Sequence, residues 1–163
     1  MNEPLTPHSR SLRPADLERV VEIDAYYAGR SRKLFFKKRL EAALANTKGF
    51  IAVATETNTT LTGFAIARLQ DGEFGIDRKV AVLDVIGVDP KSLNAGQGTM
   101  LLDHITEQAK LLGISEIRTQ LDWHDQNLLG FFADQGFLLA PSQVLERAVT
   151  KSIEPPTQGG TRN

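Results

Sequence analysis

The clearest pattern of apolar and polar residues runs from Val80 to Leu112. Residues 80–88 are almost continuously apolar and β-branched, which is typical of a strand buried on both faces. Asp89 and Pro90 follow and mark a turn, because proline cannot continue a hydrogen-bonded ladder. Apolar side chains then recur at helical spacing up to Gly113, which stands where a C-cap glycine is expected. The stretch therefore predicts a strand, a glycine-bearing loop and a helix.

The rest of the chain gives shorter signals of the same kinds. We expect a loose tail over residues 1–10, a first strand over 11–13, a helix opened by Pro14 and ended near Gly29, and a disordered tail over 152–163. Between them we expect helices over 31–45 and 126–135, strands over 50–54, 63–69, 116–121 and 144–149, and a strand beginning at 136–137. This order predicts a single α/β domain over 11–151, with a mixed, mostly antiparallel sheet and helices on both faces.

Composition narrows the class of protein further. The 163 residues are 41% apolar and 24% charged, with a formal net charge of −1, so no overall positive field favours nucleic acid. The chain has no cysteine, which excludes disulfides and thiolate chemistry. We see no membrane span and no signal peptide, and therefore expect a cytoplasmic protein. The three histidines lack metal-ligand spacing, and we expect no metal.

The junction between the central strand and its helix has the features of an anion-binding site. The first amides of a helix lack intrahelical partners and carry partial positive charge, and Gly96 and Gly98 let an anion approach them. We expect a phosphate or pyrophosphate there; the alternative is a plain turn without a ligand. Leu101 excludes the dinucleotide fingerprint, and Thr99-Met100 excludes a Walker phosphate loop.

Two motifs give a resemblance to a known family. Val88-Asp89-Pro90, Gly96-Gln97-Gly98 and Leu101-Leu102 resemble the acyl-CoA motif of the GCN5-related N-acetyltransferases, although Leu93 replaces the family's Gln or Arg. The stretch 131–137 resembles the family's second motif, with Phe132 in place of its tyrosine. The resemblance implies the GNAT fold and acetyl transfer from acetyl-CoA to a primary amine of a small molecule or peptide. It also implies coenzyme-binding positions: Ile86, Gly87, Val88, Leu93, Asn94, Ala95, Gly96, Gln97, Gly98, Thr99, Asp125, Phe131 and Phe132.

The catalytic candidates are Asp84, Val88 and His124. Asp84 is a lone carboxylate in an apolar strand, so it is either a base or a structural aspartate bound to backbone amides or an arginine. Four residues separate it from Val88, roughly 13 Å along a strand, so a base at Asp84 would act through water. The resemblance suggests the Val88 amide as a donor to the thioester oxygen. His124 is a candidate acid in place of Phe132; the alternative is a solvated loop histidine.

No motif in the sequence identifies the acceptor substrate or a protein partner. Residues 30–39 hold six basic side chains, which either attract an anionic ligand group or form a solvated helix face. Tyr26, Tyr27 and Trp123 either line the acceptor pocket or pack. The oligomeric state stays open, although the edges of the final strands favour a homodimer. Because Leu93 and Phe132 depart from the family pattern, a catalytically silent, CoA-binding regulatory module is the alternative to an enzyme.

Overall fold

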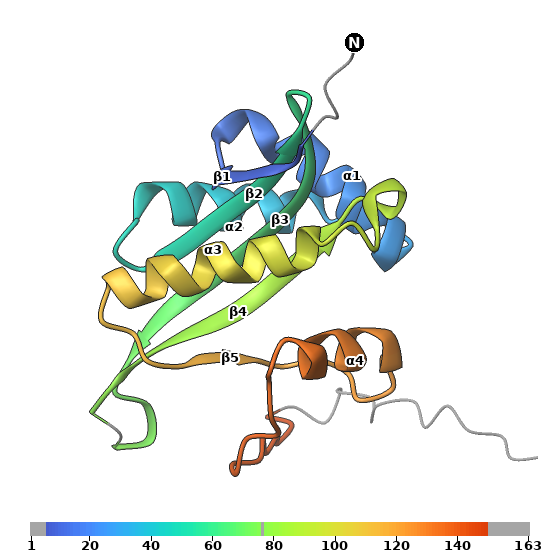
Figure 1. Ribbon diagram of the computed structural model, residues 1–163. Coiled ribbons are helices and arrows are strands. Elements are labelled where there is room, and N and C mark those ends of the chain that lie inside the picture. The colour runs from blue at the N-terminus through green and yellow to red at the C-terminus, as the bar shows by residue number, and fades with distance from the viewer. Residues whose placement is uncertain (1–5, 76, 150–163) are drawn as a thin grey trace, which may run out of the picture. The chain divides into compact units, whose positions relative to one another are not determined.

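The computed structural model describes residues 6–75 and 77–149 (Figure 1). The chain divides into two compact units between Gln126 and Asn127. The first unit contains β1 (His8–Ser11), α1 (Leu17–Ala28), α2 (Lys33–Ala45), β2 (Phe50–Thr57), β3 (Thr60–Asp71), β4 (Lys79–Val88), α3 (Gln97–Leu111) and β5 (Ile117–Thr119), with short 3₁₀ turns η1 (Pro14–Asp16), η2 (Glu73–Gly75) and η3 (Pro90–Ser92). The last helix, α4 (Gln126–Asp134), opens the second unit. None of the helices in the described ranges is both long and apolar enough to cross a lipid bilayer.

The sheet of the first unit follows the order of the sequence, β1-β2-β3-β4-β5. Its neighbours are antiparallel except for β4 and β5, which are parallel, so the expected mixed and mostly antiparallel sheet is confirmed. The β2–β3 turn consists of Asn58 and Thr59, which both have positive φ, the geometry of a tight two-residue hairpin. β5 is three residues long and therefore shorter than the strand expected over 116–121.

The first strand lies three residues earlier than expected. β1 pairs with β2 from His8 to Ser11, and the Leu12 amide adds a bond to the carbonyl of Ala52. The Leu12 side chain turns into the core, where it is 3% exposed. Pro14 then starts η1, so the strand expected over 11–13 ends earlier, because proline has no amide hydrogen to continue the pairing with β2.

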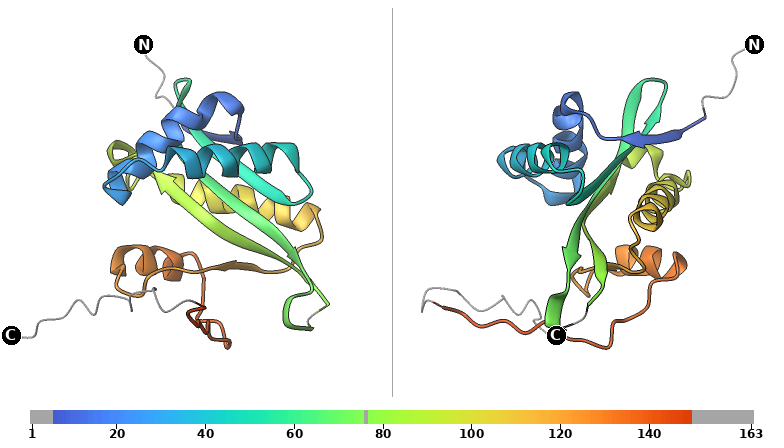
Figure 2. Two further views of the ribbon diagram at one scale, coloured as in Figure 1. Left: turned by 180° about the vertical axis from the view of Figure 1, so that it is seen from behind. Right: turned by 90° about the vertical axis from the view of Figure 1, so that its left-hand side faces the viewer.

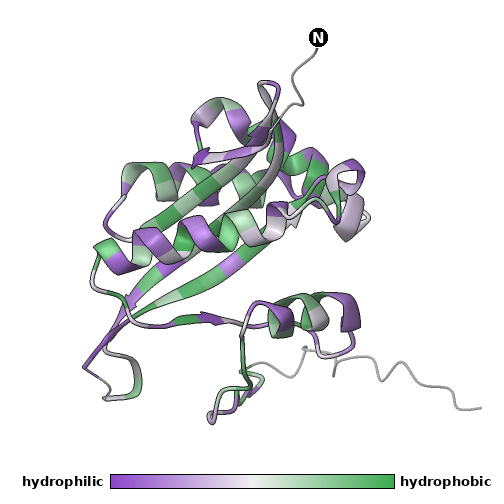
Figure 3. Ribbon diagram, viewed as in Figure 1, coloured by the Kyte–Doolittle hydropathy of each residue, from purple (hydrophilic) through white to green (hydrophobic). Residues whose placement is uncertain are grey.

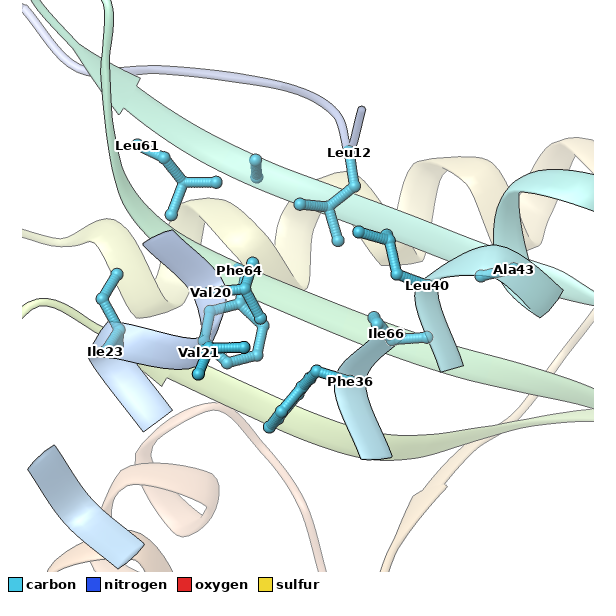
Figure 4. Close-up of a cluster of buried hydrophobic side chains, with 11 residues drawn as sticks. Leu12, Val20, Val21, Ile23, Phe36, Leu40, Ala43, Leu61, Phe64 and Ile66 are labelled. Carbon is cyan, nitrogen blue, oxygen red and sulfur yellow. The ribbon is translucent and has the colours of Figure 1, made fainter. Parts of the chain in front are cut away.

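The helices α1 and α2 cover one face of this sheet (Figure 2). Their inward side chains meet β3 in a cluster that is closed by Phe36 of α2 and Phe64 of β3, both almost fully buried (Figure 4). The two rings stand edge to face with centroids 5.6 Å apart, the arrangement that aromatic quadrupoles favour. α2 begins at Lys33, two residues after the expected start, and ends at Ala45 as expected.

The helix α3 covers the opposite face of the sheet (Figure 2). Its apolar residues recur at helical spacing and alternate with polar ones, as the colouring in Figure 3 shows. Leu101 and Ile105 are fully buried, and Gly113 ends the element with φ of +72°. Helices on both faces of the sheet are therefore confirmed.

A bulge in β4 determines how the site is built. Ile66 of β3 pairs with Val85 and the next residue, Ala67, pairs with Leu83, so Asp84 is an extra residue in β4. β5 pairs with β4 only over residues 81–83. Beyond the bulge, the edge of β4 that faces away from β3 therefore has no strand partner in the described part of the chain. We call residues 84–88 on this side the open edge.

The second unit lacks two expected strands. Neither the strand beginning at residues 136–137 nor the one over 144–149 is present, so both predictions were wrong. Leu138, Leu139, Leu145 and Val149 are about nine-tenths exposed or more. Apolar alternation alone does not make a strand, because its backbone groups need a partner strand, and residues 138–149 have none within the described residues.

Candidate functional site

The loop after β4 is fixed at its start by Asp89. This side chain is buried and accepts a hydrogen bond from the Lys91 amide at 2.9 Å, which caps η3. Its other oxygen pairs with the guanidinium of Arg19 on α1, which also donates to the carbonyl of Leu61. The Asp89 amide donates to the carbonyl of Thr62 on β3. The loop therefore leaves the sheet from a rigid point.

The loop then exposes the start of α3. Asn94 and Gly96 have φ of +61° and +73°, and the left-handed conformation at Gly96 favours glycine. The residues from Leu93 to Gly96 are exposed, whereas Gln97 is buried. The first helical bond runs from the Met100 amide to the carbonyl of Gly96, so the amides of Gln97 and Gly98 have no acceptor inside the helix. This is the amide-rich, electropositive end of α3, as an anion site requires.

The Gln97 side chain anchors this end of α3 to the sheet. Its Oε1 accepts a hydrogen bond of 2.9 Å from the hydroxyl of Thr55, which lies on β2 beside a bulge in β3. Thr55 is completely buried and Gln97 is 4% exposed, so the bond is shielded from water. Gly63 makes the room, because a Cβ there would lie 2.6 Å from the Thr55 hydroxyl oxygen. The loop is therefore held at both ends.

The open edge presents backbone polar groups in alternation. The Asp89 amide bonds to Thr62 of β3, and Gly87 lies opposite Phe64, so the Asp89 amide and both backbone polar groups of Gly87 face β3. Those of Ile86 and Val88 consequently face away, along the open edge. Gly87 is required by packing, since a Cβ would meet the Phe64 ring at 2.8 Å. Residues 86–88 thus form the open edge of the first unit, and the exposed residues 93–96 follow them in the chain before α3.

Asp84 lies at the start of the open edge and is paired with two arginines. Its Oδ2 accepts from the Nε of Arg68 at 2.7 Å and lies 3.3 Å from a guanidinium nitrogen of Arg39. Arg39 comes from α2 and also stacks over the Phe35 ring, 5.4 Å from its centroid. These contacts correspond to the structural alternative that the sequence left open, an aspartate bound to arginine.

Tyr27 reaches the far end of the same edge from α1. Its hydroxyl donates to the carbonyl of Val88 with a distance of 2.6 Å. Partial burial, the neighbouring Tyr26 and the charge of Asp89 raise the pKa of Tyr27. The Tyr26 ring stands edge to face against it, with centroids 5.1 Å apart. Tyr27 therefore brings a polar group to the strand end, in addition to any packing role.

His124 lies in the loop after β5, and its contacts are with neighbouring residues of the same loop. Its Nδ1 is 2.8 Å from Asp122, and its amide donates to the same oxygen at 2.9 Å. The bond from this amide is the main reason that the pKa of Asp122 is lowered. The His124 ring is exposed and stacks beside Trp123, and Asp125 is also exposed. The contacts of His124 correspond to the solvated loop histidine of the sequence analysis.

In the second unit, α4 carries the second motif. The Phe132 ring packs against Phe131 and Phe137, with centroids 5.3 and 4.9 Å away. Gly136 has φ of +81°, and the Phe137 amide returns to the carbonyl of Phe132, which closes the helix. The motif spacing is thus explained locally by an aromatic C-terminal cap, and Phe132 offers no ionisable hydrogen.

A hollow of about 520 Å³ lies beside the start of α3, between that helix and Ser9 of β1. His104 lines it, and its Nδ1 is buried without a hydrogen-bond partner among the described residues. Burial lowers the pKa of His104. No group of three or more His, Asp or Glu side chains in the described ranges is arranged to hold a metal ion.

Sequence reasoning missed the supports of the site. Thr55 and Arg19 come from β2 and α1, far from the loop that they hold, and no local motif links them to it. Tyr27 was expected either to line the acceptor pocket or to pack, and its bond to Val88 depends on how α1 crosses the sheet. The one local signal was Asp89-Pro90, a typical start for a capped turn.

The sequence and the fold are similar to those of known acetyltransferases. The model of the Acetyltransferase (GNAT) family matches residues 17–137, whereas no curated protein matches. Among solved structures, the chain is similar to the aminoglycoside N-acetyltransferase AAC(6')-Iy in complex with CoA, with a TM-score of 0.79, 16% identity, and coverage of 92% of this chain and 99% of that one.

Two further structures have the same fold. A transcriptional regulator from Bacillus halodurans C-125 has a TM-score of 0.75 and 17% identity, covering 88% of this chain and 99% of that one. The ribosomal-protein-alanine N-acetyltransferase from Brucella melitensis biovar Abortus 2308 has a TM-score of 0.70 and 16% identity, covering 88% and 100%. At these identities the structures show the fold alone, but the family model covers most of the chain, and the chain therefore belongs to the GNAT family of acetyltransferases.

Proposed function

We propose that the chain is an acetyl-CoA-dependent N-acetyltransferase that acts on a primary amine of a small molecule or peptide. One observation carries the proposal: the open edge at Ile86 and Val88 is followed, after a short anchored loop, by amides at the start of α3 that have no acceptor inside the helix. A ligand in which an arm with amide groups is joined to a diphosphate matches this surface. Acetyl-CoA has that form, and the similar aminoglycoside acetyltransferase was solved with CoA.

The coenzyme is held largely by backbone groups in this proposal. The pantetheine arm lies along residues 86–88, and the diphosphate lies on the amides of residues 94–99. Leu93 is half exposed and supplies no charge, so the diphosphate depends on the amides and on the positive end of α3. The rigid anchors at Asp89 and Gln97 support this role, because preorganised donors lose little freedom when an anion binds.

The reaction is a direct attack. The amine nitrogen forms a bond to the thioester carbon, the carbonyl oxygen becomes an oxyanion, and the carbon–sulfur bond then breaks. The Val88 amide donates to the oxyanion, and Ile86 offers a second amide on the same edge. Asp84 has one oxygen already engaged by Arg68 and Arg39, which supports a structural role for it, with the amine proton leaving to water.

A second candidate is a module that binds CoA without catalysis. Phe132 has no proton to give to a leaving thiolate, and one solved structure of the same fold is that of a transcriptional regulator. Binding therefore has to be measured separately from turnover.

Calorimetry with acetyl-CoA tests coenzyme binding, which the enzyme and the silent module have in common. We expect binding at a single site for the wild type and clearly weaker binding for Gly96→Val, because valine does not tolerate the left-handed backbone at this position. Gly113→Val is the matched control, since it places the same strain at the other end of α3. Absence of binding to the wild type refutes the proposal.

Release of CoA in the presence of amines separates the enzyme from the silent module. A panel with an aminoglycoside, a peptide that begins with alanine and a small polyamine covers three acceptor classes. Turnover with any member supports the enzyme, whereas binding without turnover across a broad panel supports the module.

A further inference from the structure

The hydroxyl of Tyr27 donates a hydrogen bond to the backbone of the open edge. It lies 2.6 Å from the carbonyl oxygen of Val88, the last residue of β4. The ring stands at the C-terminal end of α1, which Gly29 closes with φ of +67°. About half of the side-chain surface is exposed, so the hydroxyl is reachable from solvent and from a ligand along the edge.

The position of this hydroxyl matters because the Val88 amide and carbonyl face the same side of the strand. In the proposed reaction the Val88 amide holds the thioester oxygen, and the sulfur then lies close to this strand end because it is bonded to the same carbon as that oxygen. The pKa of Tyr27 is raised, first by partial burial and then by Tyr26 and Asp89, so the phenol keeps its proton at neutral pH. Phe132, in the second unit, carries no such proton.

We propose that Tyr27 is the proton donor to the departing thiolate, an inference that rests on the acetyl transfer proposed above. When the carbon–sulfur bond breaks, the electron pair stays on sulfur, which takes the hydroxyl proton of Tyr27 and leaves as free CoA thiol. The ammonium proton of the tetrahedral adduct leaves through water, and water returns one proton to the tyrosinate. The net change is amine plus thioester to amide plus thiol.

Tyr26 provides a matched control. It is adjacent in the sequence, more exposed than Tyr27 and in edge-to-face contact with it, but its hydroxyl makes no hydrogen bond to the open edge in the described structure. Tyr26→Phe and Tyr27→Phe each remove one oxygen and keep the ring, so both variants retain the aromatic packing. Only Tyr27→Phe removes a donor from the strand end.

The first experiment needs no acceptor. The full chain is saturated with CoA, and the pKa of the bound thiol is measured from the ultraviolet absorbance of the thiolate. A hydroxyl that donates to sulfur stabilises the thiolate, so we expect Tyr27→Phe to lower the acid dissociation constant about tenfold, the size expected for one hydrogen bond to a charged atom. Tyr26→Phe is expected to match the wild type.

The second experiment uses the best amine of the panel. Because a thiolate is already a fair leaving group, we expect kcat to fall about a hundredfold in Tyr27→Phe, the low end for a positioned acid, with the KM for acetyl-CoA nearly unchanged. In the wild type, kcat is expected to fall at high pH because Tyr27 loses its proton. Tyr27→Phe is expected to lack this fall. A structural role would change KM or stability and leave the thiol pKa and the pH profile as in the wild type.

The outcomes separate the two proposals. If CoA binds and the thiol pKa is the same in the wild type and Tyr27→Phe, Tyr27 is not the donor, although acetyl transfer stands. If Tyr26→Phe and Tyr27→Phe shift the thiol equally, the effect comes from the ring pair and the assignment is overturned. If the wild type does not bind CoA, both proposals fall together.

Discussion

Replacing Thr55 by valine removes a hydroxyl that is completely buried while keeping the shape of the side chain. The hydroxyl donates to Oε1 of Gln97, which is itself 4% exposed, so the oxygen loses its donor and cannot turn to water. A buried acceptor left without a partner costs about 1–3 kcal/mol in the free energy of unfolding. The change acts on the first turn of α3, where the coenzyme amides lie.

Urea unfolding followed by circular dichroism measures this cost directly. For a chain of this size, 1 kcal/mol corresponds to a fall in Tm of about 2–4 °C. We expect a lower urea midpoint with an unchanged slope, and weaker binding of acetyl-CoA by calorimetry, because Gln97 no longer ties the start of α3 to β2. Thr55→Ser, which keeps the hydroxyl, is expected to retain most of the affinity.

A double-mutant cycle gives the decisive result. Thr55→Val combined with Gln97→Leu replaces both partners by apolar groups, which is often nearly neutral, so the double variant is expected to be more stable than the sum of the single losses predicts. Additive losses, or a Thr55→Val variant within about 0.5 kcal/mol of the wild type, would refute the argument.

Three further changes test other parts of the site. Asp84→Asn removes the negative charge that pairs with Arg68 and Arg39, so we expect lower stability with kcat nearly unchanged; a base at this position would instead give about a hundredfold loss in kcat or more. Gly87→Ala forces a methyl group to 2.8 Å from the ring of Phe64, and overpacking of this kind costs about 1–3 kcal/mol, measured by urea unfolding. Because burial lowers the pKa of His104, the unfolded chain holds that proton to higher pH, so this residue's contribution to stability is present above about pH 6.5 and is lost on acidification; urea midpoints across this range are expected to fall less steeply in His104→Gln, and equal slopes would contradict this.

The elements that were predicted well from the sequence are those in which the local pattern of apolar residues is clear. The bounds of the central strand and the end of α3 lie within two residues of expectation, because a buried β-branched run and a helical apolar stripe are local properties. Gly29 and Gly113 end their helices with positive φ, again a local requirement. The two late strands were wrong for the opposite reason, since pairing depends on a partner that alternation cannot supply.

The site was predicted only in outline. The exposed loop before α3 follows from its glycines, but its anchors at Arg19 and Thr55 are separated from it by about 40 to 70 residues of sequence. Asp84 was recognised as unusual because it is a charge in an apolar strand, yet its partners come from α2 and β3. Whether such a carboxylate is a base or an ion-pair partner is decided by those contacts.

The bulge at Asp84 explains why these features occur together. On a regular strand, residues 84 and 85 would face opposite sides of the sheet, but with one extra residue Asp84 meets Arg39 of α2 while Val85 still packs against the core under α1 and α2. The last pair between β4 and β5 is Leu83 with Thr119, directly before the bulge. The inserted residue therefore coincides with the point where the sheet parts and the amides of residues 86 and 88 become available. Asp84→Asn keeps the inserted residue and removes only the charge, whereas deletion of residue 84 restores regular pairing. If the open edge binds the coenzyme, the deletion abolishes CoA binding and the asparagine variant retains it.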